Sequence, residues 1–249
     1  MGTVYFFEQL VTGYGQSDDI TTLVDNYEWI LVPIVNVDGY EFGWENDNFR
    51  TWRKTRSMWP ANEAAMLACE AVTPGNCEGC RGTDPNRNWD FMWATVGASD
   101  NPCSNSYHGP SAFSETITQV ISQYTAPLDL RLYVDHHCCG DMYLQPYGAT
   151  DELPVAHDEI DTLGRIGCEA TDKVHGRNYC DRQGPIYTTI YPASGSSVDY
   201  MYAVNNVTYS YGTEMRSSNG NGPADPILPA SEEMWAGMAA MALDLLNRP

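Results

Sequence analysis

Hydrophobic residues recur at helical spacing near both ends of the chain. Val4, Phe7 and Val11 lie three or four residues apart. Gly13 follows as a stop signal, so the chain is expected to open on an amphipathic helix. A last helix is expected to start at Ser231. Its apolar stripe repeats at spacings of four, three and four: Met234, Met238, Met241 and Leu245. Methionines at this spacing predict core packing rather than a ligand site.

Apolar runs of strand length lie between these helices. The continuous run WILVPIVNV at 29–37 predicts a strand that is covered on both faces. Shorter runs at 130–135 and 207–215 predict two more strands. Helices are expected at 154–175 and shortly after 194–197, and a third is expected to bury one apolar stripe: Ile117, Val120, Ile121 and Tyr124.

This order of elements favours an α/β fold, in which a mixed twisted sheet is sandwiched between helices. No repeat or linker divides residues 1–249, so a single domain is expected. The stretch from 38 to 110 shows no regular pattern and contains four cysteines. Loops of this length are usually functional, and we expect this one to border the active site.

Composition excludes several classes of partner. Thirteen Lys and Arg against 33 Asp and Glu give a formal net charge of −20, which repels nucleic acids and anionic lipids. The longest apolar run, 29–35, is interrupted by Pro33 and is too short to span a bilayer. We therefore expect neither nucleic acid nor membrane as a partner.

Cysteine usage points to an oxidising compartment. The chain has eight cysteines, an even number that favours disulfides and an extracellular protein. A secretory signal starts with basic residues, but residues 1–16 contain no Lys or Arg. The expectation is therefore a secreted protein whose signal peptide, with the N-terminal portion, is not in this sequence.

Four separated parts of the chain carry motifs in a fixed order. They are VPIVNVDGYEFGW with WRKTRS, GTDPNRNWD with NPCSNSYHG, HCCGDMYLQPYG, and TTIYPASGSSVDY with YSYGTEMR. Together these segments resemble the zinc metallocarboxypeptidases of the pancreatic carboxypeptidase type. The resemblance covers nearly the whole chain and implies that family's fold, one Zn²⁺ ion and hydrolysis of the last peptide bond of a peptide or protein.

The resemblance assigns roles to five side chains. Asn86 and Arg87 match the anchor for the terminal carboxylate of the substrate, and Arg56 in WRKTRS matches the arginine that steadies the oxyanion. Tyr191 matches the tyrosine that closes over the bound substrate. Glu214 matches the general base, which takes a proton from zinc-bound water and gives it to the leaving amine.

The resemblance also implies one zinc ligand. His137 stands nine residues before Pro146 of the PYG turn, as does the family's downstream ligand. Successive strand side chains point to opposite faces, so the neighbouring His136 faces away from any metal that His137 binds. Asp84 matches the carboxylate that orients another ligand histidine.

The family's other two zinc ligands come from a His-x-x-Glu motif, and none of the five histidines here has Glu three residues onward. Catalytic zinc normally has three protein ligands. We therefore expect the chain to lack its N-terminal portion and to be inactive by itself. The alternative is a binder of peptide C-termini without hydrolysis, although Glu214 favours an enzyme. A disulfide-stapled structural protein explains none of the motifs.

Specificity depends in the family on the base of a side-chain pocket. Val198 holds that position, which favours an apolar or aromatic C-terminal residue. Further wall candidates are Ala193, Ile186 and Gly148. Asp135 stands where a small residue is expected and would make the site more acidic. Nothing in the sequence indicates an oligomer, so a monomer is expected.

The resemblance pairs Cys80 with Cys103 in a disulfide. Two further local pairs are expected, Cys69 with Cys77 and Cys168 with Cys180. Cys138 and Cys139 remain, and the alternatives of a bond between neighbours and of a thiolate at the zinc stay open.

Overall fold

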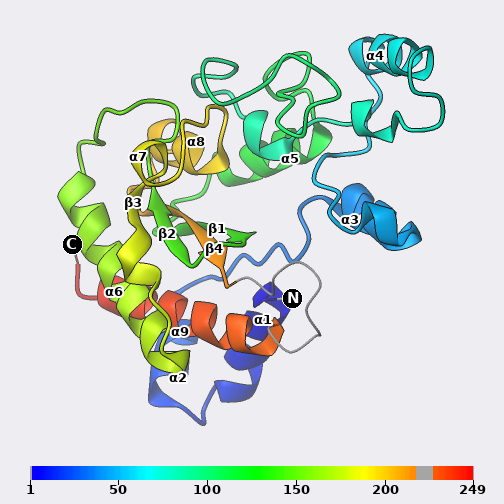
Figure 1. The fold of residues 1–249 in the computed structure, drawn as a ribbon. Helices are drawn as coiled ribbons and strands as arrows, with labels where there is room; N and C mark the ends of the chain where they lie inside the picture. The colour runs from blue at the N-terminus through cyan, green and yellow to red at the C-terminus, as the bar shows by residue number, and fades with distance from the viewer. Residues whose placement is uncertain (1, 217–226, 249) are drawn as a thin grey trace.

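A computed structural model describes residues 2–216 and 227–248. In this part of the chain one mixed sheet has the strand order β1–β4–β2–β3 (Figure 1). The strands are β1 (Tyr133–Cys138), β4 (Ser210–Met215), β2 (Met142–Gln145) and β3 (Gln183–Pro185). The pairs β1–β4 and β2–β3 are parallel, and β2–β4 is antiparallel. The predicted mixed sheet is confirmed.

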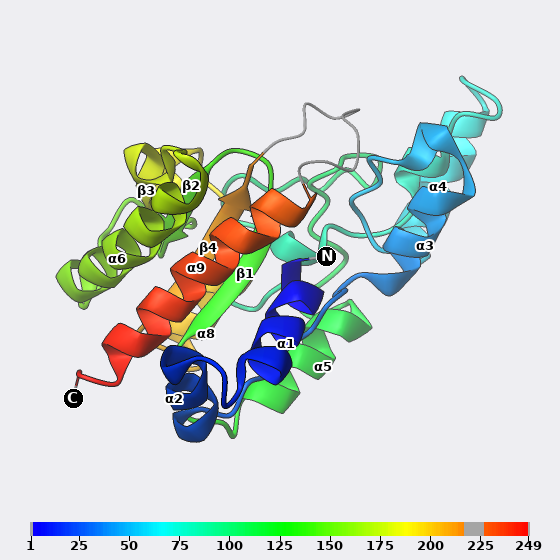
Figure 2. The ribbon, with the colours of Figure 1, turned by 90° about the horizontal axis from the view of Figure 1, so that it is seen from below.

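Helices cover both faces of the sheet. On one face lie α1 (Gly2–Gly13), α6 (His157–His175) and α9 (Ile227–Leu245), with α2 (Asp18–Asn26) beside them (Figures 1 and 2). The main core forms here, between α6, α9 and the sheet. It buries the predicted α9 stripe: Met234, Met238, Met241 and Leu245. The prediction of core packing for these residues is therefore confirmed.

The opposite face is covered by α5 (Thr116–Thr125), α7 (Ile186–Thr189) and α8 (Ser197–Ala203). Ser196 caps α8, because its hydroxyl accepts a hydrogen bond from the Asp199 N–H at 3.2 Å. A second cluster of buried residues, which includes Trp89 and Tyr200, fills the space between this helix and the loops.

The stretch from 38 to 110 is less irregular than its pattern suggests. It contains α3 (Val37–Glu45), which Asn36 caps, and α4 (Pro60–Glu70), which starts with proline at its first position. The remaining short elements are single 3₁₀ turns: Asp47–Phe49, Glu78–Cys80, Pro85–Arg87 and, later in the chain, Tyr179–Arg182.

Two predicted apolar elements are not buried as expected. Residues 29–37 form no strand, and α3 already begins at Val37. On α5 the buried residues are Thr118, Ser122 and Thr125, whereas Val120 and Tyr124 of the predicted stripe are more than half exposed. The physical reason is shared: within residues 2–216 and 227–248 no strand pairs with the outer edge of β1, so the side chains that would cover such a strand lack a packing partner there.

All eight cysteines are paired. The bonds Cys69–Cys77, Cys80–Cys103 and Cys168–Cys180 are those expected. The remaining bond joins the neighbours Cys138 and Cys139, so neither thiol is free to bind a metal. Within residues 2–216 and 227–248, no helix has the length and apolar character needed to cross a membrane.

Candidate active site

The pairing of β1 with β4 brings two predicted site residues together. His137 is the direct register partner of Glu214, and Asp135 is the partner of Gly212 two residues earlier. Alternate residues of a strand share a face, so the side chains of Asp135, His137 and Glu214 lie on one side of the sheet. An imidazole and two carboxyl groups thus lie on the same face of the sheet, toward the carboxyl end of β1.

The turn at Pro85–Arg87 holds Asn86 against this group. Asp84 caps the turn, because its Oδ1 accepts a hydrogen bond from the Asn86 N–H at 3.0 Å. The Asn86 Oδ1 accepts from the Ser197 N–H at 2.9 Å, and its Nδ2 lies 3.0 Å from His137 Nε2. Asn86 therefore connects the loop, α8 and β1 through one side chain.

Arg87 lies next to Asn86 and is nearly buried. Its Nε donates to the Gly97 carbonyl at 2.9 Å and its Nη1 to the Asn86 carbonyl at 2.7 Å. These bonds fix the guanidinium plane and leave Nη2 without a hydrogen-bond partner among the described residues. The Tyr191 ring lies 6.0 Å from the Arg87 Cζ and is 53% exposed. A fixed cation beside an exposed phenol suits a planar anion.

The structure does not bring Arg56 to this group. Its guanidinium pairs with Glu78 at 2.8 Å and stacks over the rings of Phe42 and Trp52. The cation that faces the site is Arg53, whose Nε donates to Asp84 Oδ2 at 2.9 Å. The charge of Arg53 also acts on Glu214 and His137. Arg53, and not Arg56 as the sequence predicted, therefore lies next to this group of residues.

Asp135 dominates the electrostatics of His137. Its Oδ2 lies 2.9 Å from His137 Nε2 and accepts a hydrogen bond from the Ser197 hydroxyl at 2.6 Å. The Asp135 charge raises the pKa of His137, against the opposing effect of burial. Burial would raise the pKa of Asp135, but its two histidine neighbours and Ser197 lower it to about 2. Nε2 accepts from Asn86 when neutral and donates to Asp135 when protonated, so the two contacts are alternatives.

His136 points to the opposite face of β1. Its Nδ1 lies 2.7 Å from the Thr213 hydroxyl, and its ring edge packs against Phe6 at 5.3 Å between centroids. Burial lowers the pKa of His136 to about 4, so this ring is neutral at pH 7. His137 is therefore the histidine that faces the candidate site.

Glu214 has the environment of a proton-transfer group. Burial raises the pKa of its carboxyl, and the positive charges of His137 and Arg53 oppose that rise. A carboxyl group with a raised pKa, set beside an imidazole, is typical of a general base.

A cluster of buried apolar side chains packs next to these polar groups. Its members come from β2, α7, the following loop and α8: Met142, Leu144, Ile186, Ala193 and Val198. Gly148 lies against this cluster, because a Cβ there would lie 2.7 Å from the Ala193 carbonyl oxygen. The buried Asp199 accepts hydrogen bonds from the N–H groups of Gly148 and Ala149 at 2.9–3.0 Å. Burial raises the pKa of Asp199 to about 6.

Sequence reasoning missed three contributors to the site. Arg53 shares its motif with Lys54 and Arg56, and no spacing rule distinguishes the three cations. Ser197 acts through its backbone N–H and hydroxyl, which leave no compositional signal. Asp199 was recognisable only as an acidic residue next to Val198.

A zinc ion needs at least three protein ligands at a catalytic site. Within the described residues, no group of three His, Cys, Asp or Glu side chains lies close enough together to hold a metal. His137 is one suitable ligand, and its Nε2 already contacts Asp135 and Asn86. These residues alone do not fit a zinc ion.

Comparison with known proteins identifies relatives along the whole chain. The zinc carboxypeptidase family model matches residues 2–237. The chain is 35% identical to carboxypeptidase B of Astacus astacus over 96% of its own length and 73% of that protein. It is 35% identical to zinc carboxypeptidase A 1 of Drosophila melanogaster over 97% of its length, but spans only 52% of that relative.

Solved structures agree with this result. The structure of bovine thrombin-activatable fibrinolysis inhibitor in complex with tick carboxypeptidase inhibitor superposes with a TM-score of 0.85 at 26% identity, over 100% of this chain and 77% of that one. Carboxypeptidase A from Helicoverpa armigera superposes with a TM-score of 0.80 at 31% identity, over 99% of this chain and 57% of that one. The chain therefore belongs to the zinc carboxypeptidase family of hydrolases.

Proposed function

We propose that the candidate site around Arg87, His137 and Glu214 binds the C-terminal residue of a peptide and supplies the anion-binding and base groups of a carboxypeptidase reaction. The observation that carries the proposal is the hydrogen-bonded connection between Arg87, Asn86 and His137. It connects the fixed guanidinium of Arg87 to His137, whose partner across the strands, Glu214, has a pKa raised by burial. Hydrolysis of a terminal peptide bond needs both functions close together.

Each side chain has a separate task in this proposal. The free Nη2 of Arg87 donates to the terminal carboxylate, and Tyr191 covers it. Glu214 takes a proton from the attacking water and transfers it to the leaving amine. Arg53 stabilises the negative charge on the scissile carbonyl oxygen, which is the role predicted for Arg56 from the sequence.

The described residues do not close a zinc site, so recognition is proposed to be separable from turnover. Arg87, Asn86 and Tyr191 need no metal to hold a carboxylate. Cleavage needs ligands beyond His137, and the chain on its own is proposed to be inactive.

The apolar surroundings of Val198 support a preference for apolar or aromatic C-terminal residues. Val198 is 2% exposed and lies among aliphatic side chains. The carboxylate of Asp135 is engaged by His137 and Ser197 instead of standing free in the pocket. A cationic C-terminal residue therefore finds no unpaired carboxylate there.

A second candidate function is a binder of peptide C-termini that does not hydrolyse them. The lack of a three-ligand metal group among residues 2–216 and 227–248 favours it. The raised pKa of Glu214 favours the enzyme, because a binder has no need of a general base.

We also propose that the protein works outside the cell. Four disulfides suit an oxidising compartment outside the cell. Peptide or protein C-termini are the proposed partners, and the proposed working state is a monomer.

Calorimetric titration of the refolded chain tests the proposed recognition. N-acetyl-Gly-Phe as the free acid is expected to bind at least about tenfold more tightly than its C-terminal amide, because only the acid pairs with Arg87. N-acetyl-Gly-Lys acid is expected to bind more weakly than the Phe peptide. Equal affinity for acid and amide overturns the carboxylate assignment, and a preference for Lys overturns the apolar pocket.

A further inference from the structure

The turn between α8 and β4 carries an Asn-Val-Thr sequence: Asn206, Val207 and Thr208. No other asparagine in the chain is followed two positions later by Ser or Thr. Asparagine in this pattern is the acceptor for N-linked glycans, which are bulky and belong on the surface of secreted proteins. The structure of the turn therefore decides whether the folded protein has room for a glycan there.

The turn directs Asn206 outward, because both of its neighbours are held inward. Asn205 Nδ2 donates to Thr125 Oγ1 at 2.9 Å. Val207 is 1% exposed, and its N–H donates to the Met201 carbonyl at 2.9 Å. Asn206 between them is exposed, and its side chain makes no hydrogen bond to any residue that the structure describes. The amide nitrogen to which a glycan would attach is therefore accessible.

The backbone at this position suits an asparagine. The φ angle of Asn206 is +56°, in the left-handed region where asparagine is enriched over most residues other than glycine. Thr208 is half-buried, and within residues 2–216 and 227–248 no side chain or backbone group bonds to its hydroxyl. Neither the amide of Asn206 nor the hydroxyl of Thr208 is thus needed for a hydrogen bond that supports the fold.

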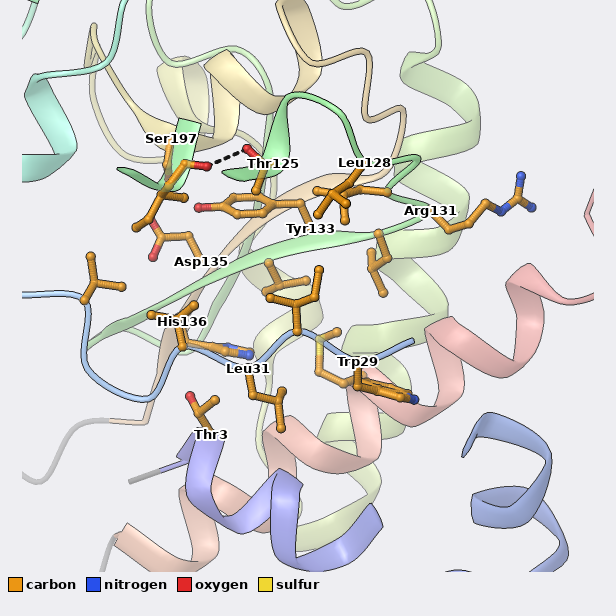
Figure 3. Close-up of a pocket in the computed structure, with 18 of the residues that line it drawn as sticks. Thr3, Trp29, Leu31, Thr125, Leu128, Arg131, Tyr133, Asp135, His136 and Ser197 are labelled. Atoms are coloured by element: carbon orange, nitrogen blue, oxygen red, sulfur yellow. Dashed lines mark hydrogen bonds between the residues drawn. The ribbon is translucent and has the colours of Figure 1, made fainter. Parts of the chain in front are cut away.

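The turn lies at the end of the sheet opposite the candidate site. β1 and β4 run parallel, and His137 pairs with Glu214 near their carboxyl ends. Asn206 precedes β4 and so lies at the amino end. Figure 3 shows the direction of β1, from Arg131 at the amino end to His136 near the other. A glycan on this turn therefore leaves the candidate site open.

We propose that Asn206 carries an N-linked glycan. Its Nδ2 forms a bond to the anomeric carbon of the first N-acetylglucosamine of a lipid-linked oligosaccharide and loses one proton. The bond between that carbon and the pyrophosphate of the lipid breaks, and the pyrophosphate oxygen keeps the electron pair. Donor and transferase belong to the eukaryotic secretory pathway, so this inference rests on the proposed extracellular setting and not on the proposed peptide recognition.

Expression of the full chain behind a cleavable signal peptide in mammalian cells tests the proposal. Molecules with all four disulfides formed are isolated from cells and medium. Peptide mapping by mass spectrometry is then carried out before and after treatment with peptide-N-glycosidase F. Most of these molecules are expected to carry a glycan that the enzyme releases, with conversion of Asn206 to Asp.

Two variants of Thr208 form a matched pair for this test. Thr208→Ser keeps the hydroxyl of the acceptor pattern and is expected to keep the glycan. Thr208→Val keeps the branched shape without the hydroxyl and is expected to lose the glycan. An unmodified Asn206 in the disulfide-bonded molecules, a glycan that persists on Asn206 in Thr208→Val, or a glycan found only on molecules with incomplete disulfides overturns the proposal.

A binding measurement separates this inference from the proposed function. N-acetyl-Gly-Phe acid is expected to bind the glycosylated and the enzymatically deglycosylated protein with the same affinity within about twofold, because Asn206 lies at the far end of the sheet. Binding that is at least about tenfold weaker in the glycosylated form contradicts the placement of the glycan away from the site. Absence of binding in both forms contradicts the proposed function instead, since the mass of the peptide that contains Asn206 reports the glycan independently.

Discussion

The candidate site has a proposed recognition half and a proposed reaction half, and the described residues build the first more completely than the second. In the recognition half, Arg87 is held by two hydrogen bonds to backbone carbonyls, and Tyr191 stands beside it. In the reaction half, Glu214 and His137 are correctly paired across β4 and β1, but His137 contacts Asp135 and Asn86 rather than a set of further metal ligands. Among the described residues, the proposed substrate anchor is thus more complete than the proposed catalytic centre.

This difference follows from where the supporting contacts come from. Arg87 depends on contacts within residues 86–97 and on a loop tied by the Cys80–Cys103 disulfide. His137 depends on the edge strand β1, whose outer side pairs with no strand in the part of the chain that the structure describes. Local contacts therefore preserve the anchor, whereas the reaction half depends on a sheet edge that is open.

The largest expected effect concerns Asp199, which supports the pocket wall of the recognition half. Burial raises its pKa from the ordinary 3.8 to about 6, a difference that corresponds to about 3 kcal/mol. Asp199 loses its proton at a lower pH in the unfolded chain than in the folded protein. Its contribution to the free energy of unfolding is therefore complete below about pH 4 and is lost as the pH rises through about 6. Asp199→Asn keeps an acceptor for Gly148 and is expected to remove that loss.

Urea unfolding of wild type and variant at pH values from 4 to 7 measures this effect. The exposed Asp90→Asn serves as the control and is expected to keep the wild-type profile. Parallel profiles for wild type and Asp199→Asn contradict the prediction.

The second expected effect separates the two arginines. Arg87→Met removes a charge-assisted hydrogen bond and is expected to weaken binding of N-acetyl-Gly-Phe acid about 30-fold, while leaving the amide unaffected. Arg56→Met removes the same charge from a side chain that pairs with Glu78, and is expected to change neither affinity. Calorimetry measures both affinities, and a loss confined to Arg56→Met contradicts the assignment of the carboxylate anchor to Arg87.

The third effect concerns the pocket alone. Val198→Ala removes buried methyl groups and is expected to weaken binding of the Phe peptide about fivefold, with the ratio of acid to amide affinity unchanged. Val204→Ala, at the exposed end of α8, provides the control. If the variant binds the Phe peptide as tightly as wild type, Val198 is not part of the specificity pocket.

The smallest effect is a change in titration within the reaction half. Asp135 is the main cause of the raised pKa of His137, so Asp135→Asn is expected to lower that pKa. Nuclear magnetic resonance of the imidazole resonances follows the titration. Asp199→Asn, which lies outside the contacts of His137, is expected to leave it unchanged. An unaltered His137 titration in Asp135→Asn shows that another group sets its charge.

Patterns that depend on one element were predictable from the sequence. The periodicity of the apolar residues in α9 was sufficient to predict their burial. The motifs assigned His137 and Glu214 to the same site, and the two residues lie on paired strands. Residues 29–37 have the composition of a buried strand, but a strand also needs a partner. Among the described residues, they pair with no strand of the sheet, and β1 remains its edge strand. Arg53 and Arg56 belong to one motif, and only the folded loop shows which of them reaches Asp84.

The most direct test of the account is the affinity for N-acetyl-Gly-Phe acid with and without zinc. The account assigns carboxylate recognition to Arg87, Asn86 and Tyr191, none of which needs the metal. Calorimetry in the presence of a chelator and with one equivalent of zinc is expected to give the same affinity within about twofold, and no hydrolysis in either case. A gain of tenfold or more with zinc, or turnover of the peptide, contradicts the separation of recognition from reaction.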